Sequence, residues 1–571
     1  MCGIYCYIGK KKALPILIDG LKKLEYRGYD SSGIAYVTDK VNIIKEKGKI
    51  ENLEKLLDNN IETFLGIGHT RWATHGVVNE INAHPHKQGK ITIVHNGIIE
   101  NYSKLKQELS NYNLKSLTDT EVLCCLIDKL YNEEKNILKA LNKLKDKVIG
   151  SYALGVILND DLNSLYAIKK DSPLILANSD IGNFIASDIP AIIKYTNKYI
   201  ILENDEIAHL TKDNITIYNN LNIIDKKINT FEGNIENCTK NGYDDFMLKE
   251  IYEQPDVIKN TIDSFNMDFD LNKYNKIHIV GCGSAYHAGL IGKYLIEKYL
   301  NIETNVYVAS EYRYNKSFYD KNTLVIFISQ SGETADTLAC VKKVKNDNID
   351  TLGIVNVVSS SIAREVDTVI YTKAGCEIAV ATTKAYTSQI VILTLLALKN
   401  KFEFEKQIFN KILNKNYLDI AKLLYKKESI FFIGRGIDYY LSLEASLKLK
   451  EISYIHSEAY QAGELKHGTI SLIDENSYVI AINTNKDLSE KTISNIKEVK
   501  ARNCKVIYIV SEELDEENNF YDEKIVIPKI EQYITPILTI IPLQLIAYNV
   551  AKLKGCDIDK PKNLAKSVTV E

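Results

Sequence analysis

The stretch "IHIVGCGSAYHAGLIGKYLIE", residues 277–297, decides the fold of the larger part of the chain. It begins as a continuous apolar run, turns at Gly281 and Gly283, and continues with apolar residues at helical spacing. This strand–turn–helix order is typical of parallel sheets whose strands are covered on both faces. The stretch therefore predicts a doubly wound α/β domain.

The same pattern returns in "IFFIGRGIDYYLSLEASLKLKE", residues 430–451, where Gly434 lies 153 positions after Gly281. The next strand and helix also match, as "LVIFISQSGETADTLACVKKVK" and "YVIAINTNKDLSEKTISNIKEVK". Two copies of one fold are the simplest explanation of ordered matches at one spacing. We expect the copies to span residues 251–410 and 411–560.

Length, charge and cysteine content limit the classes of protein to which the chain can belong. A chain of 571 residues calls for about three domains. Its net charge of −3 gives no broad basic surface, so a nucleic-acid partner is not expected. The 10 cysteines are scattered, which fits reduced thiols in the cytoplasm better than a disulfide framework.

The best membrane candidate is residues 533–553, but it contains two prolines, Gln544 and Asn549. A buried helix with a proline-marked start is therefore expected, and neither a membrane span nor a signal peptide.

Residues 1 to about 240 have a different pattern of expected strands and helices from the repeated half. Short alternating strands are interleaved with helices, including two helices that begin near Asp119 and a hairpin around residues 159–163. This predicts a mixed α+β domain over residues 2–238. The sequence becomes polar near residue 233, and we expect a linker at 239–250.

In the first repeat copy, "FISQSGETADTL" follows a buried strand and opens a helix. Hydroxyl and amide side chains there stand beside the free N–H groups of a helix N-terminus, which favours a bound phosphate over a simple polar cap. The candidate phosphate ligands are Ser329, Gln330, Ser331 and Thr334. The second copy reads "INTNKDLS" and has lost this run, so only the first copy is expected to bind phosphate.

Cys2 follows the initiator methionine, so removal of Met1 would place a thiol and a free α-amine on one residue. A cysteine nucleophile needs a base, oxyanion donors and a substrate clamp. Asn96 and Gly97 are candidate oxyanion donors, and Arg71 could hold a carboxylate as a bidentate pair. Together with Asp119, which could hold an ammonium group, this set suits an α-amino acid.

Other polar residues give weaker signals. Glu444, Lys448 and Glu451 share one helix face, and their spacing alone favours a solvated charged stripe. His467 alone would normally be structural, and the β-like end "SVTVE" predicts a docked C-terminal tail. His84 and His86, on either side of Pro85, are not accompanied by a full set of metal ligands at the usual spacing, so no metal site is expected.

Taken in order, these motifs resemble those of the glutamine–fructose-6-phosphate aminotransferase (isomerizing) family over essentially the whole chain. The matching motifs are "MCGI", "LEYRGYDSSGIA", "HTRWATHG", "HNGIIENY", "TDTE", "KEIYEQP", "SQSGET", "SLKLKE", "SEAYQAGELKHG" and "NLAKSVTVE". Each is weak alone, but the ordered set is specific.

The resemblance implies an N-terminal-nucleophile amidotransferase domain with αββα layers, followed by two doubly wound SIS domains and a catalytic tail at 561–571. Cys2 would attack the side-chain amide of glutamine, with its α-amine as the base and Asn96 and Gly97 as oxyanion donors. Trp72 would gate an ammonia channel. The residues implied around glutamine are Arg27, Arg71, Trp72, Thr74, His75, His84 and Asp119.

For the sugar site, the resemblance implies that Lys566 forms a Schiff base with open-chain fructose 6-phosphate and that Glu451 moves the proton. His467 would assist ring opening from a neighbouring subunit, which implies a homodimer with a shared site. No metal or organic cofactor is implied. The remaining residues implied near the sugar are Ser284, Val380, Thr382, Glu444 and Lys448, beside the phosphate ligands Ser329, Gln330, Ser331 and Thr334.

Three positions depart from the family pattern. Lys562 stands in place of an arginine, Thr382 in place of a serine, and Ala285 in place of a hydroxyl residue, which puts one sugar contact in doubt. Three alternatives stay open: an amidophosphoribosyltransferase, an SIS-type enzyme for another sugar phosphate, and a non-catalytic sugar-phosphate sensor. The first needs a phosphoribosyl-binding loop that the sequence lacks, and the last would not need Cys2, Lys566 and Glu451 together.

Overall fold

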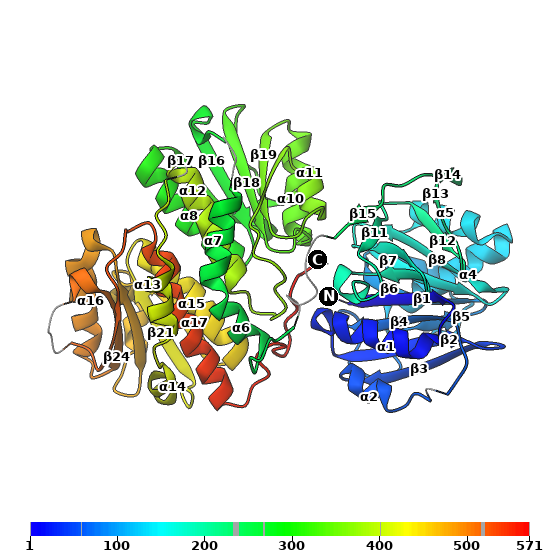
Figure 1. Ribbon diagram of the computed structural model, residues 1–571, viewed down its shortest axis with the longest axis horizontal. Coiled ribbons are helices and arrows are strands. Elements are labelled where there is room, and N and C mark those ends of the chain that lie inside the picture. The colour runs from blue at the N-terminus through cyan, green and yellow to red at the C-terminus, as the bar shows by residue number, and fades with distance from the viewer. Residues whose placement is uncertain are drawn as a thin grey trace. The chain divides into compact units, whose positions relative to one another are not determined.

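The computed structural model describes residues 2–58, 60–231, 239–265, 269–399, 401–515 and 520–569. The chain forms two compact units, Met1–Cys238 with Ala565–Glu571, and Thr239–Leu564 (Figure 1). Residues 232–238, the first part of the polar run near residue 233, lie outside the described residues. Helix α6 (Phe246–Tyr252) begins inside the range expected as a linker, and it buries Met247 in the second unit.

The first unit contains two antiparallel sheets. The first has the order β15-β11-β9-β10-β1-β4-β2-β3, with β1 (Gly3–Gly9), β2 (Ser31–Val37), β3 (Val41–Lys47), β4 (Leu65–Arg71), β9 (Ile175–Ser179), β10 (Gly182–Ala186), β11 (Lys198–Ile201) and β15 (Asn229–Thr230). The second has the order β14-β13-β12-β8-β7-β6-β5, with β5 (His86–Gln88), β6 (Ile91–Ile99), β7 (Gly150–Leu158), β8 (Asp161–Lys170), β12 (Ile207–Leu210), β13 (Ile215–Asn219) and β14 (Asn222–Ile224). The helices are α1 (Ala13–Leu24), α2 (Ile50–Glu54), α3 (Tyr102–Glu108), α4 (Asp119–Glu134) and α5 (Ile137–Lys147).

The alternation of side chains along β1 shows how these layers stack. Tyr5 and Tyr7 pack against α1, whereas Ile4, Cys6 and Ile8 point the other way and pack against the second sheet. Helices α4 and α5 cover the opposite face of that second sheet. The predicted αββα arrangement is therefore confirmed, as are the two helices from Asp119 and the β7–β8 hairpin.

The second unit contains two parallel five-stranded sheets with the same strand order, β17-β16-β18-β19-β20 and β22-β21-β23-β24-β25. The first copy consists of β16 (Lys276–Gly281), α8 (Ser284–Leu300), β17 (Glu303–Val308), α9 (Ala309–Tyr312), β18 (Thr323–Ser329), α10 (Ala335–Asn346), β19 (Asp350–Val355), α11 (Ser361–Glu365), β20 (Thr368–Tyr371) and α12 (Lys384–Ala397). The second consists of α13 (Lys406–Leu413), α14 (Leu418–Leu424), β21 (Ser429–Gly434), α15 (Ile437–Ser453), β22 (His456–Gln461), β23 (Tyr478–Asn483), α16 (Ser489–Lys500), β24 (Lys505–Ser511), β25 (Glu523–Ile527) and α17 (Thr535–Leu553). Helix α7 (Gln254–Ser264) precedes both copies (Figure 1), and the identical strand orders of the two sheets confirm the predicted duplication.

One hydrophobic core joins the two copies within this unit. It takes side chains from both sheets and from helices α8, α12, α15 and α17. Among the described residues, α17 is the one helix long and apolar enough to cross a membrane, but 83% of its apolar window is buried inside the unit. It is a core helix with Pro536 in its first turn, as its sequence predicts.

Candidate active sites

Cys2 lies one residue before β1 of the first sheet and is bonded to Asn96 on β6 of the second sheet. Its Sγ accepts a hydrogen bond from the backbone N–H of Trp72 at 3.2 Å, just beyond the end of β4. Its carbonyl oxygen accepts from Arg27 Nε at 3.2 Å and from Asn96 Nδ2 at 2.9 Å. Burial raises the pKa of the Cys2 thiol, and the Arg71 guanidinium opposes that rise. The thiol is thus held in place but needs a base.

A pocket opens beside this thiol. It is lined by Cys2, Arg71, Trp72, Thr74, His75, His84, His95, Gly97, Thr118, Asp119 and Thr120. Eight of the ten predicted amidotransferase residues are in this lining, and the other two, Arg27 and Asn96, contact the Cys2 backbone. Sequence reasoning missed His95, Thr118 and Thr120, although the two threonines flank Asp119 in the "TDTE" motif.

Arg71 offers the pocket a cationic donor. Its side chain is 2% exposed, and its Nη2 donates to the carbonyl oxygens of His75 and Gly76. Its Nη1 is buried and has no hydrogen-bond partner among the described residues. Because an unsatisfied buried guanidinium donor is costly, this atom suits the carboxylate of a bound ligand.

The other predicted pocket residues carry structural bonds as well. Asp119 accepts the backbone N–H groups of Ile99 and Thr120, each at 2.9 Å. Gly97 has φ +137°, and a Cβ there would meet the Ser151 carbonyl oxygen at 2.0 Å, so only glycine fits. Asn96 Nδ2 already donates to the Cys2 carbonyl and to Ser187 Oγ, so its oxyanion role stays a prediction.

Four buried histidines lie together in this unit. The rings of His69 and His84 stack with centroids 4.1 Å apart, and His86 and His95 lie close to His84. Burial lowers the pKa of each, in the case of His69 to about 3, so the rings are neutral. Within the described part of the chain no group of three or more metal-ligating side chains is placed to hold a metal ion.

In the second unit, the predicted phosphate loop lies between β18 and α10. Ser329 Oγ accepts from the Gly332 N–H at 3.0 Å and lies 2.9 Å from Thr334 Oγ1. Gly332 has φ +65°, and a Cβ there would lie 1.9 Å from Ser360 Oγ. The loop is therefore a tight turn at the carboxyl edge of a parallel sheet, where ligands of doubly wound folds bind.

The corresponding loop of the second copy is closed by a side chain of the protein. Asp438 is fully buried, and its carboxylate accepts the backbone N–H groups of Thr484 at 2.8 Å and Asn485 at 3.0 Å. Burial raises the pKa of Asp438 to about 6, against these hydrogen bonds. At the corresponding position the first copy has Ala285, which has no side-chain acceptor. A carboxylate thus takes the N–H groups that a phosphate would need, which supports the prediction that only the first copy binds phosphate.

The charged face of α15 is not solvated, so that interpretation of its spacing is wrong. Glu444 and Lys448 are 0% exposed, and Lys448 Nζ lies 3.4 Å from Glu444 Oε1 and 2.5 Å from Glu451 Oε2. Burial lowers the pKa of Lys448, but the two carboxylates outweigh it and the net direction is upward. Packing of α15 inside the unit's core places these charges in the interior.

This buried cluster reaches the first copy through α8. Ser284 Oγ donates to Glu444 Oε1 at 2.8 Å, and His287 Nδ1 lies 2.7 Å from Glu444 Oε2. Sequence reasoning missed His287, which is one helical turn after Ser284. The structure thus brings Ser284, Glu444, Lys448 and Glu451 together, as predicted for the sugar site.

Four predicted residues lie outside these bonds. His467 is exposed at the end of a short 3-10 helix, Leu465–His467. Val380 is buried, and its N–H donates to the Asp559 carbonyl at 3.0 Å, while Thr382 donates its hydroxyl to Glu377. Lys566 belongs to the tail from Ala565 onward, which groups with the first unit. The roles of His467 and Lys566 stay predictions.

The fold and the two sites define a glutamine amidotransferase domain joined to two SIS domains. The model of the glutamine amidotransferase domain matches residues 69–194, and that of the SIS domain matches residues 270–399 and 423–554. The chain is 46% identical over 610 residues to the glutamine–fructose-6-phosphate aminotransferase [isomerizing] of Clostridium acetobutylicum and 48% identical over 612 residues to that of Clostridium tetani, with 100% of each chain covered. The solved C-terminal domain of the Francisella tularensis glucosamine-fructose-6-phosphate aminotransferase is 40% identical, with a TM-score of 0.53, over 57% of this chain and 100% of that one. This chain belongs to the glutamine–fructose-6-phosphate aminotransferase (isomerizing) family.

Proposed function

We propose that the protein converts L-glutamine and D-fructose 6-phosphate into D-glucosamine 6-phosphate and L-glutamate. The observation that carries this proposal is that the similarity to the family runs over the whole chain, so both halves of the reaction are encoded in one polypeptide.

In the first half-reaction, Cys2 Sγ attacks the side-chain amide carbon of glutamine and ammonia leaves. Once Met1 is removed, the α-amine of Cys2 takes the thiol proton and returns it to the leaving nitrogen. Water then releases glutamate from the thioester. Among the described residues the Nη1 of Arg71 has no hydrogen-bond partner, which supports a clamp on the glutamine carboxylate, with Asp119 facing the ammonium group.

In the second half-reaction, the Ser329–Thr334 loop holds the phosphate and Lys566 forms an imine with C2 of the open-chain ketose, releasing water. Ammonia from the first site displaces Lys566 at C2. Glu451 then carries a proton from C1 to C2, which turns the ketose imine into the amino aldose. The buried ion pair with Lys448 supports this role because it orients the Glu451 carboxylate.

The assembly is part of the proposal. We propose a homodimer in the cytoplasm, in which His467 of the partner subunit assists ring opening at the sugar site. The exposure of His467 in a single chain supports this, because an exposed side chain is available to a second copy.

The test is an assay of the purified protein with glutamine and fructose 6-phosphate beside other ketose phosphates. We expect glucosamine 6-phosphate and glutamate in equal amounts, with fructose 6-phosphate the preferred ketose. Preference for another sugar phosphate would instead identify an SIS-type enzyme with a different acceptor.

A further inference from the structure

The second SIS copy has a pocket that no step of the proposed reaction uses. It has a volume of about 330 Å³ and lies at the carboxyl edge of strands β22, β21 and β23. Its lining consists of residues at the ends of these strands or in the segments that follow them: Arg435, Gly436, Tyr439, Tyr440, Gln461, Gly463, Glu464 and Leu488. Ligands of doubly wound folds bind outside this edge of the sheet, so the pocket lies where a ligand is expected.

The guanidinium group of Arg435 is the main binding group of this pocket. Its Nε donates to Asn495 Oδ1 at 2.9 Å, and Asn495 Nδ2 donates to Glu498 Oε2 at 3.2 Å, which fixes the orientation of the Asn495 amide. Asn495 is buried, so the anchor is shielded from water. Within the described part of the chain, Nη1 and Nη2 of Arg435 have no hydrogen-bond or ion-pair partner. The guanidinium is thus held at its inner end, while its two outer nitrogens are available to a ligand.

Gly463 makes room for this guanidinium. A Cβ on Gly463 would lie 2.4 Å from Arg435 Nη2 and 2.9 Å from its Cζ, so any side chain there would displace the group. The corresponding positions of the first copy, each 153 residues earlier, are Cys282 and Ser310. The second copy therefore combines an arginine with a neighbour that has no side chain to block it. Because Asp438 already occupies the N–H groups of the adjacent loop, Arg435 is the group left to bind an anion in this copy.

The charges in the lining select the class of anion. The turn from Gln461 to Glu464, closed by the Glu464 N–H on the Gln461 carbonyl at 2.8 Å, places an acid in one wall of the pocket. Of the eight described residues in the lining, Arg435 is the one cation. A phosphate monoester carries up to about two negative charges and would be repelled by Glu464, whereas a carboxylate carries one. A ligand with a carboxylate for Arg435 and an ammonium group for Glu464 leaves neither charge unpaired.

We propose that this pocket is a second amino-acid site, which binds an α-amino acid with an uncharged side chain through its carboxylate on Arg435 and its ammonium group beside Glu464. A second carboxylate on the ligand would find no further cation in the lining, which disfavours glutamate. Tyr439, Tyr440 and Gln461 supply the hydroxyl and amide groups for a neutral polar side chain. L-Glutamine is the amino acid of this class that the proposed reaction uses, so its choice as the ligand rests on the proposed function.

The test counts the glutamine molecules that one chain binds. In Cys2→Ala, which cannot hydrolyse the ligand, calorimetry with L-glutamine should show two equivalents per chain, one for each unit. Addition of Arg435→Gln should weaken one of them, with a rise in its Kd of about tenfold or more, as for the loss of one or two hydrogen bonds between charged groups.

Gly463→Ala tests the geometry without removal of the charge. The backbone of Gly463 is outside the left-handed region, and the atoms that its methyl group would meet belong to the end of a flexible side chain, so the urea midpoint should not change. Its Kd should rise as in Arg435→Gln, and in the Arg435→Gln background it should have no further effect. Arg502→Gln is the control, because this exposed arginine of the same copy donates to the Glu498 carbonyl and does not line the pocket. It should keep two equivalents.

Two results would overturn the inference: glutamine binding with the same stoichiometry and Kd with and without Arg435, or binding of L-glutamate at the second site as tight as that of L-glutamine. If Arg435→Gln does not fold, Gly463→Ala decides by the same criterion. A wild-type protein that forms no glucosamine 6-phosphate would refute the proposed function instead, so the two failures are distinguishable.

Discussion

The backbone N–H of Trp72 donates to Cys2 Sγ at 3.2 Å, and this bond ties the start of β1 to the end of β4. Because β1 and β4 are neighbours in the centre of their sheet, the thiol is fixed although it lies at a chain end. The same bond favours the thiolate, which burial alone disfavours.

Replacement of Cys2 by alanine should abolish glutamine hydrolysis, with a loss of about a thousandfold or more, because the nucleophile itself is removed. Binding of fructose 6-phosphate, measured by calorimetry, should not change.

Intact mass of active wild-type protein should show that the chain starts at Cys2. Active protein that retains Met1 would contradict the use of the α-amine as the base.

Gly332→Ala should damage the phosphate loop in particular. The residue has φ +65°, and its new methyl group would lie 1.9 Å from Ser360 Oγ, so the loop must open. We expect KM for fructose 6-phosphate to rise about tenfold or more, as for the loss of one or two bonds to a charged ligand.

Gly555→Ala is the matched control for this variant. Gly555 has nearly the same backbone angle, φ +68°, but nothing lies within 4 Å of the position of its Cβ. It should lose some stability and keep its KM. Equal KM values for the two variants would show that backbone strain alone explains the effect of Gly332→Ala, and that the clash with Ser360 does not contribute.

Acid should destabilise the first unit because its buried histidines take up protons on unfolding. The folded pKa values of His69, His84, His86 and His95 lie below 6.5, so the unfolded state binds more protons as the pH falls. The stability these rings contribute is present above pH 6.5 and is lost as the pH falls toward the folded values. Each ring should cost up to about 1.4 kcal/mol per pH unit in that window.

Fluorescence of Trp72, the chain's one tryptophan, reports on this unit alone in urea titrations between pH 7 and 5. We expect the urea midpoint to fall steadily over that range. A midpoint independent of pH would show that these histidines are not neutral in the folded protein.

The sequence predicted local features well where chemistry and backbone share one motif. The phosphate loop is an example, because the order of strand, polar turn and helix places Ser329 and Thr334 together without help from distant residues. The duplication was visible for the same reason, since each copy repeats the same local units.

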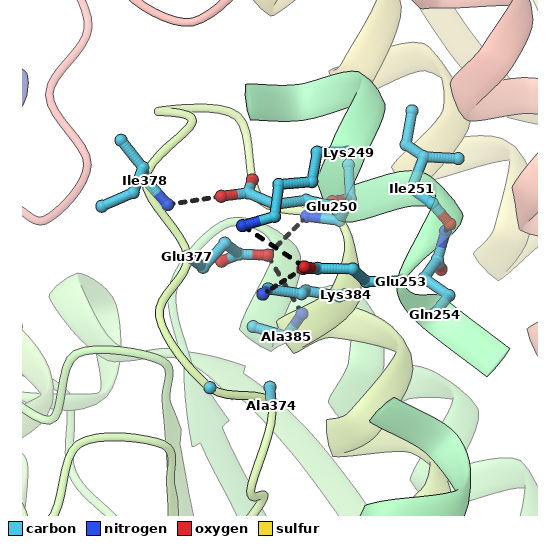
Figure 2. A network of polar contacts seen from close by, with 12 residues as sticks. Lys249, Glu250, Ile251, Glu253, Gln254, Ala374, Glu377, Ile378, Lys384 and Ala385 are labelled. Atoms are coloured by element: carbon cyan, nitrogen blue, oxygen red, sulfur yellow. Dashed lines mark hydrogen bonds and ion pairs between the residues drawn. The ribbon is translucent and has the colours of Figure 1, made fainter. Parts of the chain in front are cut away.

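Long-range placement was harder to predict. The spacing of Glu444, Lys448 and Glu451 on α15 is the same in a solvated stripe and in a buried cluster, and only the packing of α15 within the core decides between them. Glu377 carries no local signal that it accepts the N–H groups of Thr383 and Ala385 at the start of α12, because these partners are defined by the path of the loop before that helix (Figure 2).

The most direct test of the whole account is to measure both activities of Lys566→Ala, with Lys562→Ala as the control. Lys562 Nζ lies over the ring of Tyr454, 4.4 Å from its centroid, and has no part in the proposed chemistry. The account predicts that Lys566→Ala forms no glucosamine 6-phosphate but still hydrolyses glutamine, whereas Lys562→Ala keeps both activities. Glucosamine 6-phosphate formed by Lys566→Ala at the wild-type rate would contradict it.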